Sequence, residues 1–208
     1  MKRFTARPND DANRTLAYAV VVIGASWGGL AAFREIFTAL PPEFDIPTVV
    51  VPHRHRDSDA MLARFLQDFT SLAVCEAEDK QPLVSGRVFI APSNYHTLVE
   101  QGHLSLSTEA PVNFSRPSID VTMTSAADVY GHRAVGVVLT GANDDGSRGL
   151  RRIHDAGGMA VIQDPDTAES PAMPLSALRA VPTARVFKLD RLATFLGALP
   201  HPARHGVA

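Results

Sequence analysis

Apolar and polar positions divide the chain into two alternating kinds of segment. Continuous runs of β-branched and other apolar residues occupy 18–23, 47–51, 72–76, 88–91, 134–139, 159–163 and 185–189, and each run predicts a strand. Segments with apolar residues at helical spacing lie at about 30–40, 58–69, 119–130, 147–155, 175–180 and 192–199. This order predicts an α/β fold, with a mainly parallel doubly wound sheet between two layers of helices (αβα).

Two segments depart from this alternation. Short apolar runs at 97–99 and 104–106 are joined around residues 100–103, and this spacing predicts a small β-hairpin that projects from the sheet. Residues 164–173 predict a long loop. No linker or low-complexity tract divides the chain, so we expect a flexible N-terminal arm at 1–17, a single domain at 18–200 and a C-terminal tail at 201–208.

Composition narrows the function classes. The 208 residues are 45% hydrophobic and 20% charged, which is typical of a globular protein with a sizeable core. A net charge of −2 argues against general nucleic-acid binding. The single cysteine, Cys75, excludes an internal disulfide. No apolar segment reaches membrane-spanning length and residues 1–17 lack a hydrophobic signal core, so we expect a cytoplasmic protein without membrane insertion.

The loop after the first predicted strand, Gly24-Ala25-Ser26-Trp27-Gly28, has three interpretations. It matches the G-x-S-x-G nucleophile elbow in the required strand-turn-helix setting. It also resembles a G-x-G-x-x-G dinucleotide loop, but Ser26 stands where the second glycine should be and no acidic residue ends the next strand. The third interpretation is a tight turn that needs its glycines for backbone reasons alone.

Polar side chains follow two further predicted strands. His53 follows the second, and Asp144 and Asp145 follow the strand at 134–139. The carboxyl ends of parallel strands share one edge of a sheet, so Ser26, His53 and an aspartate predict a hydrolytic triad there. Each residue also has a structural interpretation: His53 as a histidine at the edge of the core, and the Asn143–Gly146 turn as a helix cap.

A metal site is the alternative for the second loop. His53, His55 and Asp57 form an H-x-H-x-D pattern similar to part of the metallo-β-lactamase-like motif, and imidazole and carboxylate groups suit zinc. That motif continues with a histidine, whereas this chain has Ser58. We therefore favour a site without metal.

The chain resembles the catalytic domain of the chemotaxis-receptor methylesterases (CheB-type) from about Val20 to Lys188. The resemblance rests on Gly24-Ala25-Ser26, His53 and Thr140-Gly141-Ala142-Asn143-Asp144-Asp145-Gly146. Supporting stretches are Glu76-Ala77-Glu78-Asp79, Ile90-Ala91-Pro92, Arg116-Pro117-Ser118-Ile119-Asp120-Val121, Gly136-Val137-Val138-Leu139-Thr140-Gly141 and Met173-Pro174, in matching order and spacing.

The resemblance implies a serine esterase that hydrolyses glutamate γ-methyl esters on the helices of methylated chemoreceptors, with glutamine deamidation as a related activity. Ser26 would be the nucleophile, His53 the general base and then acid, and Asp145 the group that orients His53. Backbone N–H groups of Trp27 and Ala142 would hold the oxyanion. No metal or organic cofactor is implied.

The chain also departs from the family pattern. Trp27 replaces a small residue, Ala142 replaces a methionine, and Ser115 replaces a histidine before the Arg-Pro-Ser element. Three further residues, Arg116, His96 and Met173, are candidates for lining the substrate cleft.

The short N-terminus bears on how the protein is controlled, and together with Trp27 it leaves a second function open. Only about 17 residues precede the first strand, so control through a phosphoacceptor domain within this chain is not expected. Because of Trp27 and this short N-terminus, the alternative function is a catalytically silent module of the same fold that binds a receptor or another partner.

Overall fold

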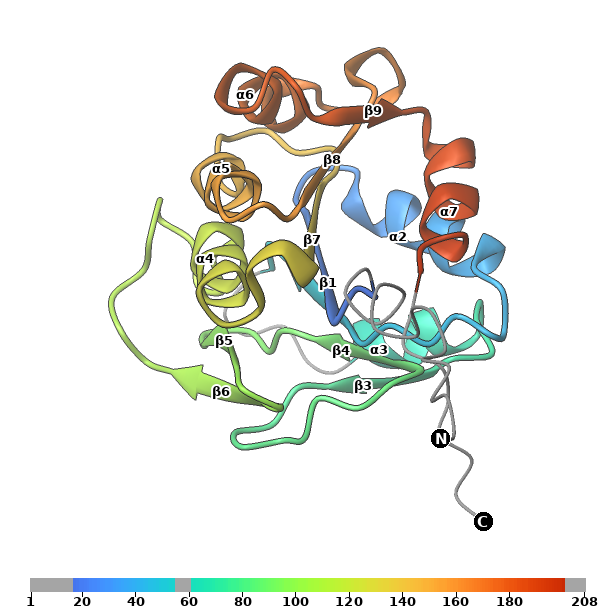
Figure 1. Cartoon of the computed structure of the whole chain (residues 1–208), viewed down its shortest axis with the longest axis vertical. Coiled ribbons are helices and arrows are strands. Elements are labelled where there is room, and N and C mark those ends of the chain that lie inside the picture. Colours follow the sequence, from blue (N-terminus) through green and yellow to red (C-terminus); the bar gives the residue numbers. More distant parts are fainter. Residues whose placement is uncertain (1–16, 55–60, 201–208) are drawn as a thin grey trace, which may run out of the picture.

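The computed structural model describes residues 17–54 and 61–200, and a parallel sheet forms its centre. Seven strands lie in the order β3-β4-β2-β1-β7-β8-β9, and each neighbouring pair runs parallel (Figure 1). Their bounds are β1 Val20–Ala25, β2 Thr48–Pro52, β3 Ala73–Glu76, β4 Arg87–Ile90, β7 Ala134–Val138, β8 Met159–Gln163 and β9 Arg185–Phe187.

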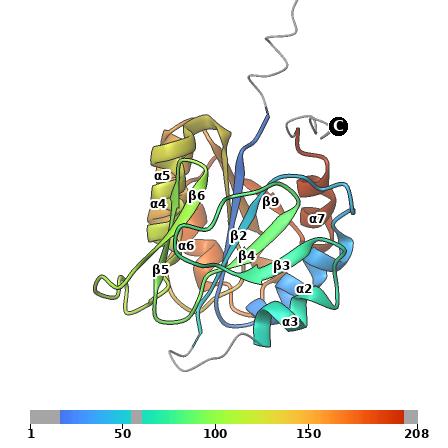
Figure 2. The same cartoon turned by 90° about the horizontal axis from the view of Figure 1, so that it is seen from below.

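Helices cover both faces of this sheet, as the two views in Figures 1 and 2 show. One face carries α2 (Gly29–Ala39), α3 (Met61–Gln67) and α7 (Leu189–Gly197). The other carries α4 (Ile119–Tyr130), α5 (Ser147–Asp155) and α6 (Ala172–Ala180). The predicted three-layer α/β architecture is therefore confirmed.

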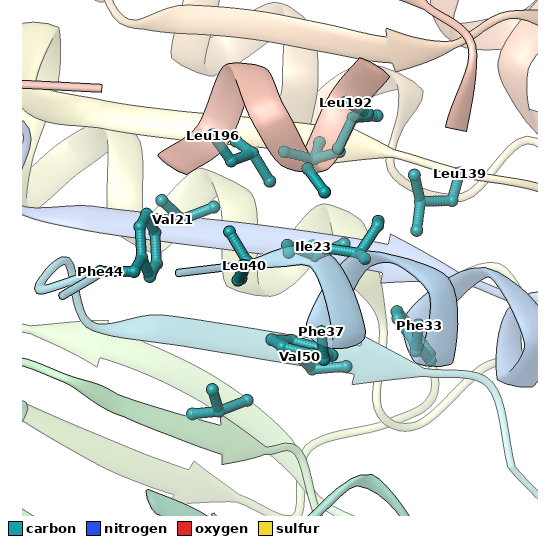
Figure 3. Close-up of a cluster of buried hydrophobic side chains, with 14 of the residues drawn as sticks. Val21, Ile23, Phe33, Phe37, Leu40, Phe44, Val50, Leu139, Leu192 and Leu196 are labelled. Atoms are coloured by element: carbon teal, nitrogen blue, oxygen red, sulfur yellow. The ribbon is translucent and has the colours of Figure 1, made fainter. Parts of the chain in front are cut away.

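One apolar core lies on each side of the sheet, because alternate residues of each strand point to opposite faces. Val21 and Ile23 of β1 pack with Phe33, Phe37 and other residues beneath α2 and α7 (Figure 3). Val20 and Val22 pack into the second core beneath α4, α5 and α6. All six residues of β1 are buried, which explains its unbroken apolar sequence.

The predicted hairpin forms a separate two-stranded sheet of β5 (His96–Glu100) and β6 (His103–Ser107). It packs on α4 through polar contacts. The Thr122 hydroxyl donates to the carbonyl of Thr97 (2.7 Å), and the Val99 N–H donates to Ser125 Oγ (2.9 Å).

Some predicted boundaries need correction. The long loop expected at 164–173 contains a 3₁₀ turn at Pro165–Thr167, and α6 begins at Ala172 rather than Leu175. Pro174 is compatible with this earlier start, because a proline is tolerated in the first turn of a helix, where no intrahelical N–H bond is needed. Residues 1–16 of the arm expected at 1–17, and the whole tail expected at 201–208, lie outside the described residues.

The strand order creates a crevice at one edge of the sheet. β1 and β7 are neighbouring strands. After β1 the chain continues into α2 on one face of the sheet, and after β7 it continues into α5 on the other face. Ligands of doubly wound sheets bind at such a switch point, outside the carboxyl ends of the strands. Among the described helices, none is long and apolar enough to cross a membrane.

Close packing of α5 on α4 depends on Gly149. A Cβ at this position would lie 2.6 Å from Met123 Cβ and 2.9 Å from the Asp120 carbonyl oxygen. We expect Gly149→Ala to lower the free energy of unfolding by about 1–3 kcal/mol through overpacking, despite the better helix propensity of alanine. Equilibrium urea denaturation measures this change.

Gly102→Ala is the control for that substitution. Gly102 has a φ of 77°, but a Cβ added there would have nothing within 4 Å, so only backbone strain of about 1 kcal/mol is expected. A Gly149→Ala variant as stable as the wild type would contradict the close α4–α5 contact.

Candidate active site

Strand register brings the first two predicted loops together. Ala25 at the end of β1 pairs with Pro52 at the end of β2. The ladder continues past both strands, because the His53 N–H donates to the Ala25 carbonyl (3.0 Å) and the Ser26 N–H donates to the Thr140 carbonyl beyond β7 (2.9 Å). The loops after β2, β1 and β7 therefore start side by side at the switch point.

Glycines allow these loops to approach one another. Gly28 precedes α2 with a φ of 78°, a left-handed conformation that side chains disfavour. At Gly141, a Cβ would overlap Met173 Sδ and would lie 2.9 Å from Ser26 Cβ. The loop after β7 can therefore lie directly against Ser26 only because residue 141 has no side chain.

The structure joins His53 to one of the two candidate aspartates. His53 Nε2 lies 2.7 Å from Asp145 Oδ2, and the two side chains are 11% and 0% exposed. Asp144 is exposed instead. The buried carboxylate beside the imidazole is therefore that of Asp145.

The N-terminus of α4 surrounds the Asp145 carboxylate with donors. Oδ1 accepts from the Ser118 hydroxyl (2.9 Å) and the Asp120 N–H (3.0 Å), and Oδ2 accepts from the Ile119 N–H (2.8 Å). N–H groups in the first turn of a helix have no intrahelical partner and favour a negative charge. Burial alone would raise the pKa of Asp145, but the bonds from His53, Asp120 and Ile119 outweigh burial and hold this pKa below its ordinary value.

The second ring nitrogen of His53 remains as a base. Because Nε2 faces a carboxylate, we assign the ring proton to Nε2 and the lone pair to Nδ1. Asn143 Nδ2 lies 3.4 Å from Nδ1, and Asn143 Oδ1 accepts from the Asp145 N–H (3.2 Å). Within the described chain, the Ser26 hydroxyl makes no hydrogen bond, so Nδ1 has an amide rather than the serine as its neighbour.

Ser26 and His53 face a common cleft of about 580 Å³. Its walls come from α2, the end of β2 and α3, and its lining residues are Ser26, Gly29, Leu30, Phe33, Pro52, His53, Arg54, Met61, Leu62 and Phe65. The side chain of Trp27 is 66% exposed and does not belong to this lining. The indole thus leaves the cleft open.

Two backbone N–H groups of the described chain, in the loops after β1 and β7, are unengaged. In the described residues, the N–H groups of Trp27 and Ala142 donate no hydrogen bond, although both neighbouring loops are otherwise well bonded. An unengaged N–H near a nucleophile is what a developing oxyanion requires. Both predicted donors are therefore available.

The three candidate lining residues have separate environments. Arg116 lines a second cavity of about 320 Å³ next to His53. Met173 is 1% exposed and packs in the second core. His96 is also 1% exposed, and its ring contacts backbone, with Nδ1 accepting from the Ser118 N–H (3.3 Å) and Nε2 lying 3.1 Å from the Ala110 carbonyl. The ring of His96 therefore holds a loop rather than facing either cavity.

Sequence reasoning missed two polar residues of the site. Asn143 belongs to the loop after β7, but the sequence alone gave it no role of its own, and its contact with His53 arises only in the fold. Ser118 directly precedes a predicted helix, so the sequence could have identified it as an N-cap residue. In the structure its hydroxyl donates to Asp145 and makes no hydrogen bond to its own helix.

The metal alternative depends on residues that the structure leaves out. His55 and Asp57 lie outside the described residues. Within 17–54 and 61–200, no group of three or more His, Cys, Asp or Glu side chains is arranged to hold a metal ion. His53 itself is bonded to Asp145.

Comparison with known proteins identifies the family of the chain. The CheB methylesterase family matches residues 21–196. The chain belongs to this family. A Leptospira interrogans protein, provisionally named a protein-glutamate methylesterase/protein-glutamine glutaminase, is 45% identical over 85% of this chain and 92% of its own length. The crystal structure of the Thermotoga maritima CheB methylesterase catalytic domain has a TM-score of 0.82 and 31% identity, covering 87% of this chain and 98% of that domain.

Other relatives of this CheB-family methylesterase are longer. A protein-glutamate methylesterase/protein-glutamine glutaminase of Anaeromyxobacter dehalogenans is 41% identical over 89% of this chain and 54% of its own length. The protein-glutamate methylesterase FrzG of Myxococcus xanthus is 36% identical, again over 54% of its length. The chain thus spans about half the length of these relatives.

Ionised Asp145 contributes to stability in a pH-dependent way. Its pKa is lower in the folded chain than in the unfolded chain, where it is about 3.9, so its stabilisation is present above that value and is lost as the pH falls through the lower folded pKa. We expect the wild type to lose free energy of unfolding below about pH 4, and Asp145→Asn to lack this part of the loss. Urea denaturation at a series of pH values measures both.

Asp144→Asn provides the matched control, since Asp144 is exposed in the same loop. It should keep the wild-type dependence on pH. Equal slopes for the wild type and Asp145→Asn would show that the α4 donors do not stabilise the ionised carboxylate.

Proposed function

We propose that Ser26, His53 and Asp145 form the triad of a serine esterase that hydrolyses glutamate γ-methyl esters on chemoreceptor helices. The observation that carries the proposal is the 2.7 Å contact between His53 and a buried Asp145, on the cleft that Ser26 also lines. A carboxylate in this position fixes the imidazole tautomer and stabilises the charged ring that forms during acyl transfer.

The reaction would begin when Ser26 Oγ attacks the ester carbonyl carbon and its proton passes to His53 Nδ1. For this transfer Ser26 Oγ must replace Asn143 Nδ2, which lies 3.4 Å from Nδ1 in a weak contact, as the neighbour of the base. The carbonyl oxygen becomes negative and would accept hydrogen bonds from the N–H groups of Trp27 and Ala142. Each such donor is typically worth ~10²–10³ in rate.

Collapse of this intermediate breaks the bond to the methoxy group, which leaves as methanol with the proton from His53. Water then attacks the acyl-enzyme, giving its proton to His53, and the second collapse returns that proton to Ser26 and releases the glutamate. A glutamine side chain would follow the same steps with ammonia as the leaving group. In this scheme Ser26 supplies the proton that leaves with methanol, water supplies the proton that returns to Ser26, and His53 carries each of them.

The walls of the cleft suit a side chain presented by a protein segment. Leu30, Phe33 and Phe65 offer apolar contact along one side of the cleft. A glutamate methyl ester is uncharged and has an apolar stem, so such walls can bind it without a charged partner. An esterase that acts on chemoreceptor helices in this way would work in the cytoplasm.

Substitution of the triad tests the proposal. We expect Ser26→Ala and His53→Ala each to reduce the release of methanol from methylated receptor by up to ~10⁶, because triad members act as a unit. Asp145→Asn should lower turnover by about 10⁴ through the wrong tautomer of His53. Asp144→Asn serves as the control and should retain wild-type turnover.

A serine-directed fluorophosphonate separates the esterase from the silent binding module. We expect mass spectrometry to find the label on Ser26, and the label to be lost in His53→Ala, because an unassisted hydroxyl is a poor nucleophile. Binding to receptor helices without any labelling of Ser26 would favour the silent module. Unchanged methanol release by Ser26→Ala would refute the triad.

A further inference from the structure

Arg54 is a buried cation beside the base. It follows His53 directly in the chain, and its side chain is 8% exposed. It lines both the cleft shared with Ser26 and the second cavity, which also contains Asn94, Phe114 and Arg116. Arg54 thus contributes to the walls of both of the spaces that flank His53.

Most of the hydrogen-bonding capacity of Arg54 is unused. Nη2 donates to Glu76 Oε1, which compensates part of the buried charge. Nε and Nη1 are buried and have no partner in the part of the chain that the structure describes. A buried donor without a partner is costly, and a buried charge more so, unless another group completes its hydrogen bonds.

Arg116 provides a contrast within the second cavity. Its Nη1 donates to the carbonyls of Thr108 (2.6 Å) and Glu109 (2.9 Å), and its Nη2 donates to Asn94 Oδ1 (2.6 Å). Only its Nε is buried without a partner among the described residues. Arg116 therefore holds a loop, whereas Arg54 keeps donors on two of its three nitrogens for another group.

The charges around the two cavities indicate what that group is. No Asp or Glu occurs among the described residues that line either cavity, whereas Arg54 lines both and Arg116 lines the second. Asp145 is not available, because its oxygens are taken by His53 and α4. The planar guanidinium matches the geometry of carboxylate and phosphate groups, and of these two an unmodified protein substrate offers the carboxylate.

We propose that Arg54 is a specificity-determining residue that binds a carboxylate of the substrate, on an amino acid next to the methyl ester in space. The proposal rests on the proposed esterase function and adds that the preferred ester has an acidic neighbour. The carboxylate accepts from the Arg54 donors that Glu76 leaves free, while the uncharged ester lies at Ser26. Arg54 takes no part in proton transfer.

Paired peptide substrates test this preference. Each carries a glutamate methyl ester, with glutamate or glutamine placed at each neighbouring position in turn. We expect the wild type to favour at least one acidic peptide over its neutral partner by about 10–100-fold in kcat/KM, the range given by one charge-assisted hydrogen bond of about 1.5–3 kcal/mol. Arg54→Gln should abolish the preference through KM, and Arg54→Lys should keep part of it.

Arg152→Gln is the matched control. Arg152 lies on α5, is exposed, and pairs with Asp128 (2.7 Å). Its substitution therefore removes the same positive charge at a position outside both cavities. It should retain the wild-type preference. Hydrolysis of p-nitrophenyl acetate reports separately on the triad and should be similar in the wild type and Arg152→Gln.

The outcomes separate this proposal from the esterase function. A wild type that hydrolyses no peptide ester refutes the esterase proposal and this one with it. Equal hydrolysis of acidic and neutral peptides at every position overturns the role of Arg54 alone. So does an effect of Arg54→Gln on kcat rather than on KM for the acidic peptide, because Arg54 would then act on His53. If Arg54→Gln does not fold, two other measurements decide. An acidic preference that is undiminished in Arg54→Lys contradicts recognition by the guanidinium. A wild type without any acidic preference overturns the proposal.

Discussion

The burial of one carboxylate organises the site. Asp145 is fully buried, so its charge requires donors from within the fold. The start of α4 supplies three of them, and His53 at the end of β2 supplies another. Because these partners come from different layers and strands, the interaction that neutralises the charge also fixes the imidazole at the switch point.

Close approach of α4 to the sheet makes that interaction possible. Ile119, in the first turn of α4, lies against Gly24 of β1 and Gly146 after β7, and a side chain at either glycine would collide with it. Gly146 also has a φ of 90°. The glycines beside the candidate catalytic residues therefore serve the packing of a helix as well as the turns that they form.

Local patterns predicted much of the fold. The bounds of α4, α5 and β8 agree with the apolar periodicity, and the alternation of elements indicated a parallel sheet. The strand order did not follow from the pattern, because continuous apolar runs look alike wherever they lie in a sheet. The pattern placed Ser26, His53 and Asp145 at strand ends, and their meeting at the switch point follows only from the order β2-β1-β7.

Contacts between distant residues lay beyond any local pattern. The bond from Ser118 to Asp145, the engagement of His96 with loop backbone and the burial of Arg54 all depend on how layers pack.

Distance along the chain has a further consequence during synthesis. The ribosome makes Ser26 and His53 long before α4 and the loop that carries Asp145, so a nascent chain holds the serine of the proposed triad without its carboxylate. Reactivity at that serine would therefore arise late, once most of the domain has been made.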